Sequence, residues 1–101
     1  MSQLKKSSSK SRSSANHSFE VGKLYLIRSV TMYYTGRLVR ITKTDLLLED
    51  AAWIADTGRF HTALKIGSFN EIEPFIKPVI VSRGSIVDAT IWNHALPREQ
   101  K

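Results

Sequence analysis

Short runs of apolar and aromatic residues, separated by polar turns, begin at about residue 23. The runs are rich in β-branched and aromatic side chains and show no clean period of 3.6 residues, which favours strands over helices. We predict strands at residues 23–31, 37–42, 46–53, 79–82 and 86–92. Tight turns are expected at residues 35–36, 43–45 and 83–85.

The predicted strand 46–53 is apolar on both faces. In an ideal strand Leu46 and Leu48 lie on one face, and Leu47, Ala51 and Trp53 lie on the other. Such a strand is either covered on both faces or bends sharply, so that its faces exchange roles. The second arrangement is the one found in small barrels.

One short helix is predicted between the strands. Phe60, Ala63 and Leu64 have the i, i+3, i+4 spacing of a helix face, and Gly67 stands where a helix commonly ends. We therefore expect a helix over about residues 59–66. Two turns are too few to be stable alone, so this helix must dock on the sheet.

These elements together predict an all-β fold. Strands that are close in sequence pair as hairpins, so we expect a small, five-stranded, strongly bent antiparallel barrel with one short inserted helix. Pro74 limits residues 69–76 to an edge strand or an irregular segment. The domain is expected to span residues 19–92, and residues 93–101 to form a polar C-terminal tail.

The N-terminal segment, residues 1–18, differs from the rest in composition. It holds eight serines and four basic residues, Lys5, Lys6, Lys10 and Arg12, without an acidic residue. So little apolar surface cannot offset the entropy of ordering, which predicts disorder. The segment is either a basic arm that contacts nucleic-acid phosphates or a solvated leader.

The charge, size and composition of the remaining residues limit which class of protein this is. Residues 19–101 hold 11 basic and 9 acidic side chains, so much of the net charge of +6 belongs to the N-terminal segment. A domain of this size buries only about 60–65% of its unfolded surface. The chain has no cysteine, so good packing or oligomerisation must stabilise it. No apolar run approaches the roughly 20 residues that span a bilayer, and no secretory signal is present, so we expect a soluble cytoplasmic protein that binds no membrane.

Two segments resemble the motifs of a known family. Residues 36–39 (Gly-Arg-Leu-Val) and 46–51 (Leu-Leu-Leu-Glu-Asp-Ala), joined by a polar turn, resemble the first Sm motif of Sm/LSm proteins. Residues 79–86 are similar to the second Sm motif, whose hallmark is an Arg-Gly corner after apolar residues. The chain departs from the family at Asp45, which stands where a base-binding asparagine is expected.

The resemblance implies a bent five-stranded sheet that assembles edge to edge into a homo-oligomeric ring and binds single-stranded RNA or other nucleic acid in its pore. Carried over to this sequence, Asp45 would contact a base edge, and Lys43 and Thr44 would line the base pocket. Arg83 and the main chain of Gly84 would close it. An aspartate can accept a hydrogen bond from a base but cannot donate one, and it repels phosphate.

Other residues add candidates of lower specificity. Tyr34 lies beside a predicted turn and could stack on a base, although large aromatic residues also pack in cores and interfaces. A basic patch would form if several cations shared one rim, and these are Arg28, Arg37, Arg40, Lys43 and Arg83. Arg37 and Arg40 have opposite parity in an ideal strand, so they share a face only if the strand bends.

The sequence gives no sign of catalysis. The three histidines lack the spacing of a metal site, and no nucleophile–base set or phosphate-binding glycine loop appears. We therefore expect no enzymatic activity, no catalytic residue, no cofactor and no metal.

Two other functions stay open. The first is a structural or assembly module, a small SH3-like barrel that oligomerises without nucleic acid, for example in a phage or a mobile element. The nearly neutral domain, Asp45 and the inserted segment 53–67 favour it. The second is a peptide reader with an aromatic cage, which requires Tyr33, Tyr34 and a tryptophan to converge.

Overall fold

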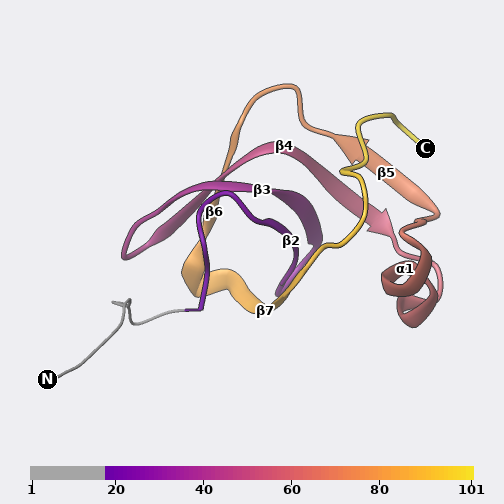
Figure 1. Cartoon of the computed structure of the whole chain (residues 1–101), viewed down its shortest axis with the longest axis horizontal. Coiled ribbons are helices and arrows are strands. Elements are labelled where there is room, and N and C mark those ends of the chain that lie inside the picture. The colour runs from indigo at the N-terminus through magenta and orange to yellow at the C-terminus, as the bar shows by residue number, and fades with distance from the viewer. Residues whose placement is uncertain (1–17) are drawn as a thin grey trace, which may run out of the picture.

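The computed structural model describes residues 18–101, which form one antiparallel sheet and a short helix (Figure 1). The strands are β2 (Leu24–Ser29), β3 (Tyr33–Ile41), β4 (Asp45–Asp56), β5 (Glu71–Pro74), β6 (Val79–Ser82) and β7 (Ile86–Ile91). Helix α1 spans Phe60–Ile66, and a 3-10 turn, η1, spans Arg83–Ser85. The predicted antiparallel, mostly β fold with one helix is confirmed at this level.

The sheet has six strands instead of five, and it is not closed into the expected barrel. Its order is β5-β4-β3-β2-β7, and β6 pairs with β4 next to β5. The long strand β4 pairs with β3 along one edge and with both β5 and β6 along the other. Within residues 18–101, β6 pairs only with β4 and β7 pairs only with β2, so each keeps one unpaired edge.

The first hairpin turns earlier than the sequence predicted. The expected turn at residues 35–36 is wrong, because both residues lie inside β3. The chain instead reverses between Ser29 and Met32, where the Ser29 hydroxyl donates to the Met32 carbonyl at 2.8 Å. The same oxygen accepts the Met32 N–H at 3.1 Å, so one serine side chain fixes the turn.

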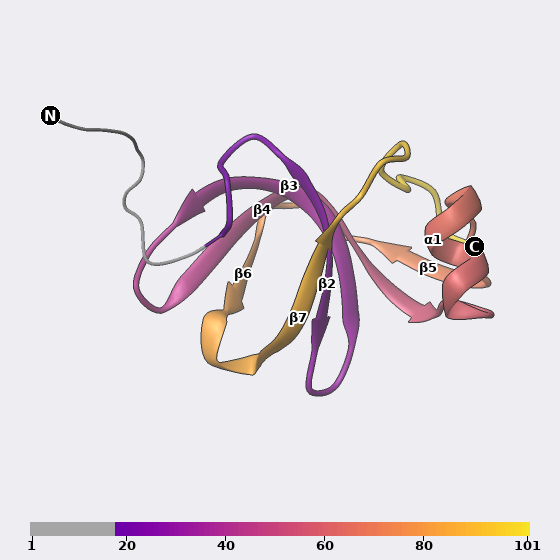
Figure 2. The same ribbon diagram turned by 60° about the horizontal axis from the view of Figure 1, so that its bottom comes forward.

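Gly36 does not form a turn; it lets strands β3 and β4 pack closely. A Cβ at this position would lie 3.1 Å from the Leu48 Cβ and 3.2 Å from the Ala51 Cβ, tighter than nine in ten real Cβ contacts. Opposite Gly36, β4 bulges at Asp50, whose φ is +50°. The missing side chain therefore lets β3 and β4 approach each other where both bend (Figure 2).

The bulge reverses which face of β4 each alternate residue points to. The sequence allowed a strand covered on both faces or a sharply bent one, and β4 takes the bent form. Before the bulge, Leu46 and Leu48 are fully buried in one core cluster, and after it Ala52 and Ile54 are buried in another. The extra residue also moves Ala51 into the first cluster, away from the face predicted for it. The sheet thus packs a core on each face.

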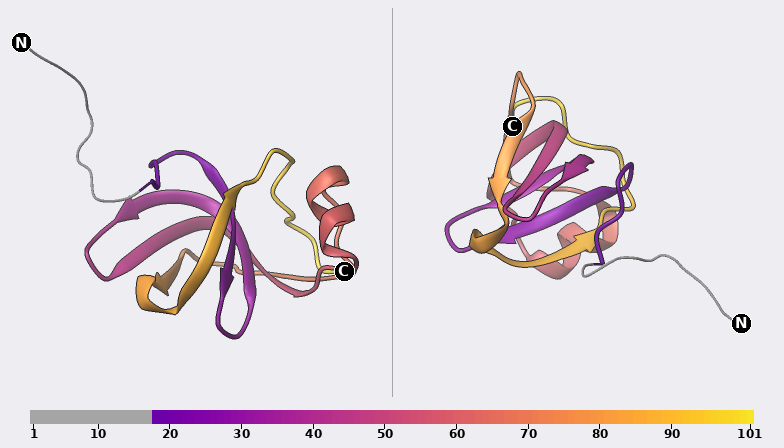
Figure 3. Two further views of the ribbon diagram at one scale, coloured as in Figure 1. Left: turned by 90° about the horizontal axis from the view of Figure 1, so that it is seen from below. Right: turned by 90° about the vertical axis from the view of Figure 1, so that its left-hand side faces the viewer.

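Helix α1 and the C-terminal residues cover the second core cluster at one end of the sheet (Figure 3). The predicted helix and its end at Gly67 are confirmed, and Gly67 has a left-handed φ of 75°. Trp92 is 2% exposed and stacks on Phe69 with ring centroids 5.1 Å apart. Helix α1 is short, and within residues 18–101 no helix is long and apolar enough to cross a membrane.

Residues 93–101 pack back onto the sheet. Arg98 donates to the Ala51 carbonyl at 2.8 Å and to the Phe75 carbonyl at 2.9 Å. Lys101 and Ile72 exchange two main-chain hydrogen bonds of 3.0 and 3.1 Å along the outer edge of β5. This polar segment therefore occupies the edge that β5 would otherwise leave unpaired.

Candidate nucleic-acid interface

The turn between β3 and β4 is held by Thr42. Its hydroxyl oxygen accepts the Thr44 N–H at 3.2 Å and the Asp45 N–H at 2.9 Å. The Thr42 N–H in turn donates to the Asp45 carbonyl at 2.9 Å. These bonds fix the backbone at the tip, where Lys43 and Thr44 are exposed and Asp45 is half-buried.

The η1 corner after β6 contacts this turn directly. The Arg83 N–H donates to the Thr44 carbonyl at 2.8 Å, and the Arg83 guanidinium donates to the Thr42 carbonyl at 2.5 Å. The Ser85 hydroxyl donates to the Ser82 carbonyl at 2.7 Å and steadies the corner. The fold thus brings the turn at 42–45 and the corner at 83–85 into one surface, with five of the residues singled out by sequence: Lys43, Thr44, Asp45, Arg83 and Gly84.

Gly84 presents open backbone on this surface. It is exposed, and a Cβ added to it would meet only the Ser82 Oγ, at 3.8 Å. Its φ is not in the left-handed region, so neither the turn nor packing requires glycine here. The absence of a side chain leaves the main chain accessible to a ligand.

Two of the five candidate cations are neutralised by neighbouring acids. Arg28 donates hydrogen bonds to the Asp88 carboxylate. This pairing lowers the pKa of Asp88 and raises the pKa of Arg28. Arg37 pairs with Asp50 at 2.6 Å, and this hydrogen bond raises the pKa of Arg37. Neither ion pair contacts the turn.

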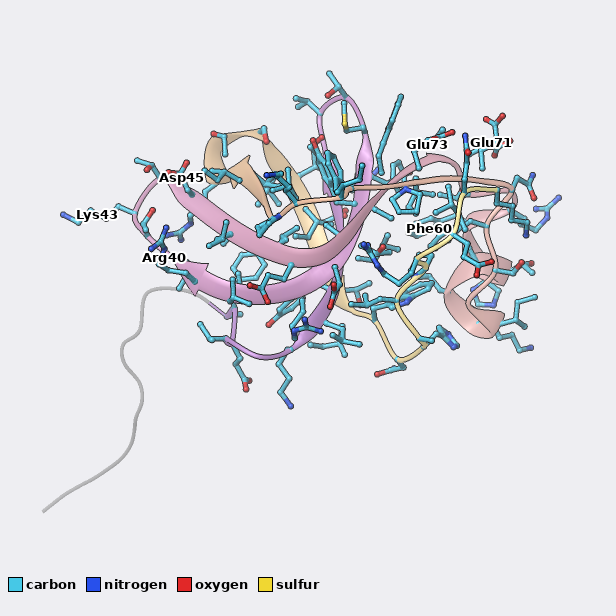
Figure 4. All side chains as sticks on the ribbon, turned by 90° about the horizontal axis from the view of Figure 1, so that it is seen from above. Arg40, Lys43, Asp45, Phe60, Glu71 and Glu73 are labelled. Carbon is cyan, nitrogen blue, oxygen red and sulfur yellow. The ribbon has the colours of Figure 1, made fainter. Side chains whose placement is uncertain are left out.

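Arg40 and Lys43 remain as exposed cations near the tip. A second register shift, between Leu38 and Arg40, places Arg40 on the same outer face as Arg37 despite their spacing. Within residues 18–101 neither Arg40 nor Lys43 forms an ion pair. Figure 4 shows both at the Asp45 end of the molecule, far from Phe60, Glu71 and Glu73. The patch therefore consists of Arg40, Lys43 and Arg83.

The aromatic candidates do not join this surface. Tyr34 lies in the first half of β3 and stacks on Phe75 with centroids 6.1 Å apart. Tyr33 packs edge to face on Phe60, at 5.8 Å, and Trp92 is buried. Because Tyr33 and Tyr34 are consecutive in β3, their rings lie on opposite faces of the sheet and cannot join a tryptophan in one aromatic cage.

Thr42 is the residue that sequence reasoning missed. A threonine whose hydroxyl can bond the N–H groups two and three residues later is a known turn-forming pattern, and residues 42–45 have it.

No group of three or more His, Asp or Glu side chains in residues 18–101 could hold a metal ion.

The four basic residues of the N-terminal segment, Lys5, Lys6, Lys10 and Arg12, lie outside the described residues. Within the described residues, the candidate surface consists of the turn at 42–45, the corner at 83–85 and Arg40. The chain matches no protein-family model, no curated protein and no solved structure.

Proposed function

We propose that this is an Sm-like, ring-forming protein that binds single-stranded RNA or another nucleic acid and has no enzymatic activity. The observation that carries the proposal is the pair of hydrogen bonds from Arg83 to the turn at 42–45. They join the two segments that resemble the Sm motifs into a single surface. The position of η1 between β6 and β7 supports the same proposal, because the Arg-Gly corner of the second motif lies there.

The chemistry of this surface suits a single strand. Arg40 and Lys43 supply charges for phosphates, and the exposed main chain of Gly84 permits close approach. The Asp45 carboxylate can accept hydrogen bonds from base N–H groups only, so it favours bases that present donors. Binding should therefore depend steeply on salt and only modestly on sequence.

The two open edges favour assembly. Arg83 and Trp92 donate their N–H groups inward, to Thr44 and Leu24 respectively. Since main-chain groups alternate in direction along a strand, the outward groups belong to Ile80 and Ser82 on β6 and to Ala89 and Ile91 on β7. Each copy thus offers two matched edges at different places, and joining one to the other gives a ring if the rotation closes.

The test combines native mass spectrometry with RNA binding by fluorescence anisotropy between about 50 and 200 mM salt. We expect one ring size and binding that falls with salt. The double variant Arg40→Ala/Lys43→Ala should weaken binding roughly tenfold and flatten the salt dependence, since each phosphate contact contributes about 0.7 to its slope. Lys65→Ala, an exposed cation on α1, is the matched control and should change neither. Absent or salt-independent binding by an intact ring would refute the nucleic-acid function.

Asp45 favours a second candidate function, an assembly module without nucleic acid. A carboxylate at the tip repels phosphate, while the open edges of β6 and β7 need no nucleic acid to pair. A ring that binds no RNA at low salt would support this function instead.

A further inference from the structure

An apolar groove runs along β7 at the edge of the sheet. It has a volume of about 600 Å³, and the residues that line it are Ser18, Phe19, Glu20, Tyr25 and Ile86–Ile91. Phe19 packs edge to face on Tyr25, with ring centroids 5.3 Å apart, and forms one wall. We call this the β7 groove. It borders the edge of β7 that is unpaired within residues 18–101.

The β7 groove lies on the face of the sheet that carries the first core cluster. Ala89 stands opposite Ile27 and Ile91 stands opposite Tyr25, and opposite residues of paired strands place their side chains on the same face. Ile27 and Tyr25 both belong to that cluster. Ile91 is nevertheless 45% exposed, because no strand of residues 18–101 lies beyond β7 to cover it. The groove therefore has an apolar side chain at its open side.

The open edge of β6 carries an exposed side chain of matching chemistry. Ile80 is 65% exposed, whereas its neighbour Val81 is buried in the first core cluster. Because side chains alternate along a strand, Ile80 points away from this cluster in its own subunit. Strands β6 and β7 diverge from the η1 corner and do not pair with each other, so the exposed edge of one does not cover the other (Figure 2).

Hydrogen-bond geometry decides which side chains meet when β6 of one copy pairs with β7 of another. In an antiparallel pair, two residues whose main-chain groups point at each other stand directly opposite and share a face. These outward groups belong to Ile80 and Ser82 on β6 and to Ala89 and Ile91 on β7. The register that uses all four residues places Ile80 opposite Ile91 and Ser82 opposite Ala89. Antiparallel pairing therefore puts Ile80 on the groove face of β7.

The ladder in this register is short. The next outward residue before Ile80 is Pro78, which has no N–H to donate. After Ser82 the chain turns into η1 at Arg83. Main-chain pairing is thus limited to two residue pairs, and a contact between side chains must add to it if the subunits are to join specifically.

We propose that Ile80 of one subunit enters the β7 groove of the next and packs beside Ile91, an inference that rests on the proposed ring assembly. The occupant is a second copy of this chain, because the exposed isoleucine lies on the strand whose outward groups match those of β7. The contact also selects the direction of pairing. A parallel β6 would place Ile80 on the opposite face, with Thr90, where the β7 groove does not receive it.

Disulfide trapping tests this contact, because the chain has no cysteine. Ile80→Cys/Ile91→Cys should form covalent oligomers on mild oxidation of the assembled full-length protein, since hydrogen-bonded residue pairs have Cα atoms about 5.5 Å apart, which a disulfide spans. The matched control is Ile80→Cys/Thr90→Cys, because Thr90 is exposed on the same strand but faces the other way. Trapping of the control alone would indicate parallel pairing. That result, equal trapping in both variants, or none in either would overturn the proposal.

A second readout is the dissociation constant of the assembly. Ile80→Ser and Ile91→Ser should each raise it about tenfold or more, and the double variant should be little worse than either, since the two residues act on one contact. Ile66→Ser is the control, because Ile66 is 61% exposed on α1 but does not line the groove. Circular dichroism checks that each variant folds. A monomeric wild-type protein would refute the ring itself, whereas a wild-type ring unaffected by Ile80→Ser would refute only this contact.

Discussion

The guanidinium of Arg83 donates to the main-chain carbonyl of Thr42 at 2.5 Å, although 41 residues separate them in the sequence. This bond and the nearby bond from the Arg83 N–H link the end of β6 to the tip of the β3–β4 hairpin. A single arginine thus orients the surface that we propose for nucleic acid.

Replacing Arg83 should affect stability and binding together. Arg83→Lys keeps the charge but loses the planar guanidinium that reaches Thr42, so we expect a loss of about 1 kcal/mol of unfolding free energy. RNA affinity should fall severalfold because the corner no longer holds the turn. Urea unfolding and fluorescence anisotropy measure the two effects. An Arg83→Lys protein with unchanged affinity would show that the corner does not position the site.

Two glycines should respond in opposite ways. Gly36→Ala places a Cβ against Leu48 and Ala51, and overpacking of this kind costs about 1–3 kcal/mol. Gly84→Ala meets only the Ser82 Oγ, at an ordinary contact distance of 3.8 Å, so its unfolding free energy should change by less than about 0.5 kcal/mol. Its RNA affinity should nevertheless fall, because the new methyl group covers the accessible main chain. Comparable affinity in Gly84→Ala and the wild type would exclude close approach at this residue.

Removing the Thr35 hydroxyl should stabilise the folded protein. Its side chain is fully buried, and Oγ1 has no hydrogen-bond partner within the described part of the chain. Thr35→Val keeps the shape and removes the unsatisfied hydroxyl, which should stabilise the protein by about 1 kcal/mol. Thermal unfolding measures the gain, and Thr62→Val on the exposed surface of α1 serves as control. A less stable Thr35→Val protein would indicate that the hydroxyl has a bound partner.

Asp45→Asn should strengthen RNA binding. The Asp45 side chain makes no hydrogen bond or ion pair within residues 18–101, so the substitution should leave the fold intact. It removes a charge that repels phosphate and adds an amide donor for base edges, which should raise affinity severalfold. Glu49→Gln makes the same charge change away from the tip and should alter binding less. Weaker binding by Asp45→Asn would mean that the carboxylate itself reads the base.

Local patterns in the sequence predicted the strands and the helix. Apolar runs located the strands, and Gly67 located the end of α1 because a left-handed residue there is a local requirement. The pattern of residues 46–53, apolar on both faces, left two arrangements open, and the membership of the two core clusters shows that β4 takes the bent one.

Tertiary contacts account for what the sequence could not supply. Gly36 looks like a turn residue until Leu48 and Ala51 are seen against it. Arg98 looks like part of a polar tail because its partners are main-chain carbonyls, which leave no trace in side-chain patterns. The contact of Arg83 with Thr42 likewise joins a side chain to a main-chain group.

The two main-chain hydrogen bonds between Lys101 and Ile72 have a consequence for the topology of assembly. They occupy the outer edge of β5, so β6 and β7 provide the remaining open edges of the sheet in residues 18–101. Each molecule then has a valence of two, one open edge on β6 and one on β7. Units of valence two form closed rings or unbranched filaments, whereas a third open edge would permit branching and gelation.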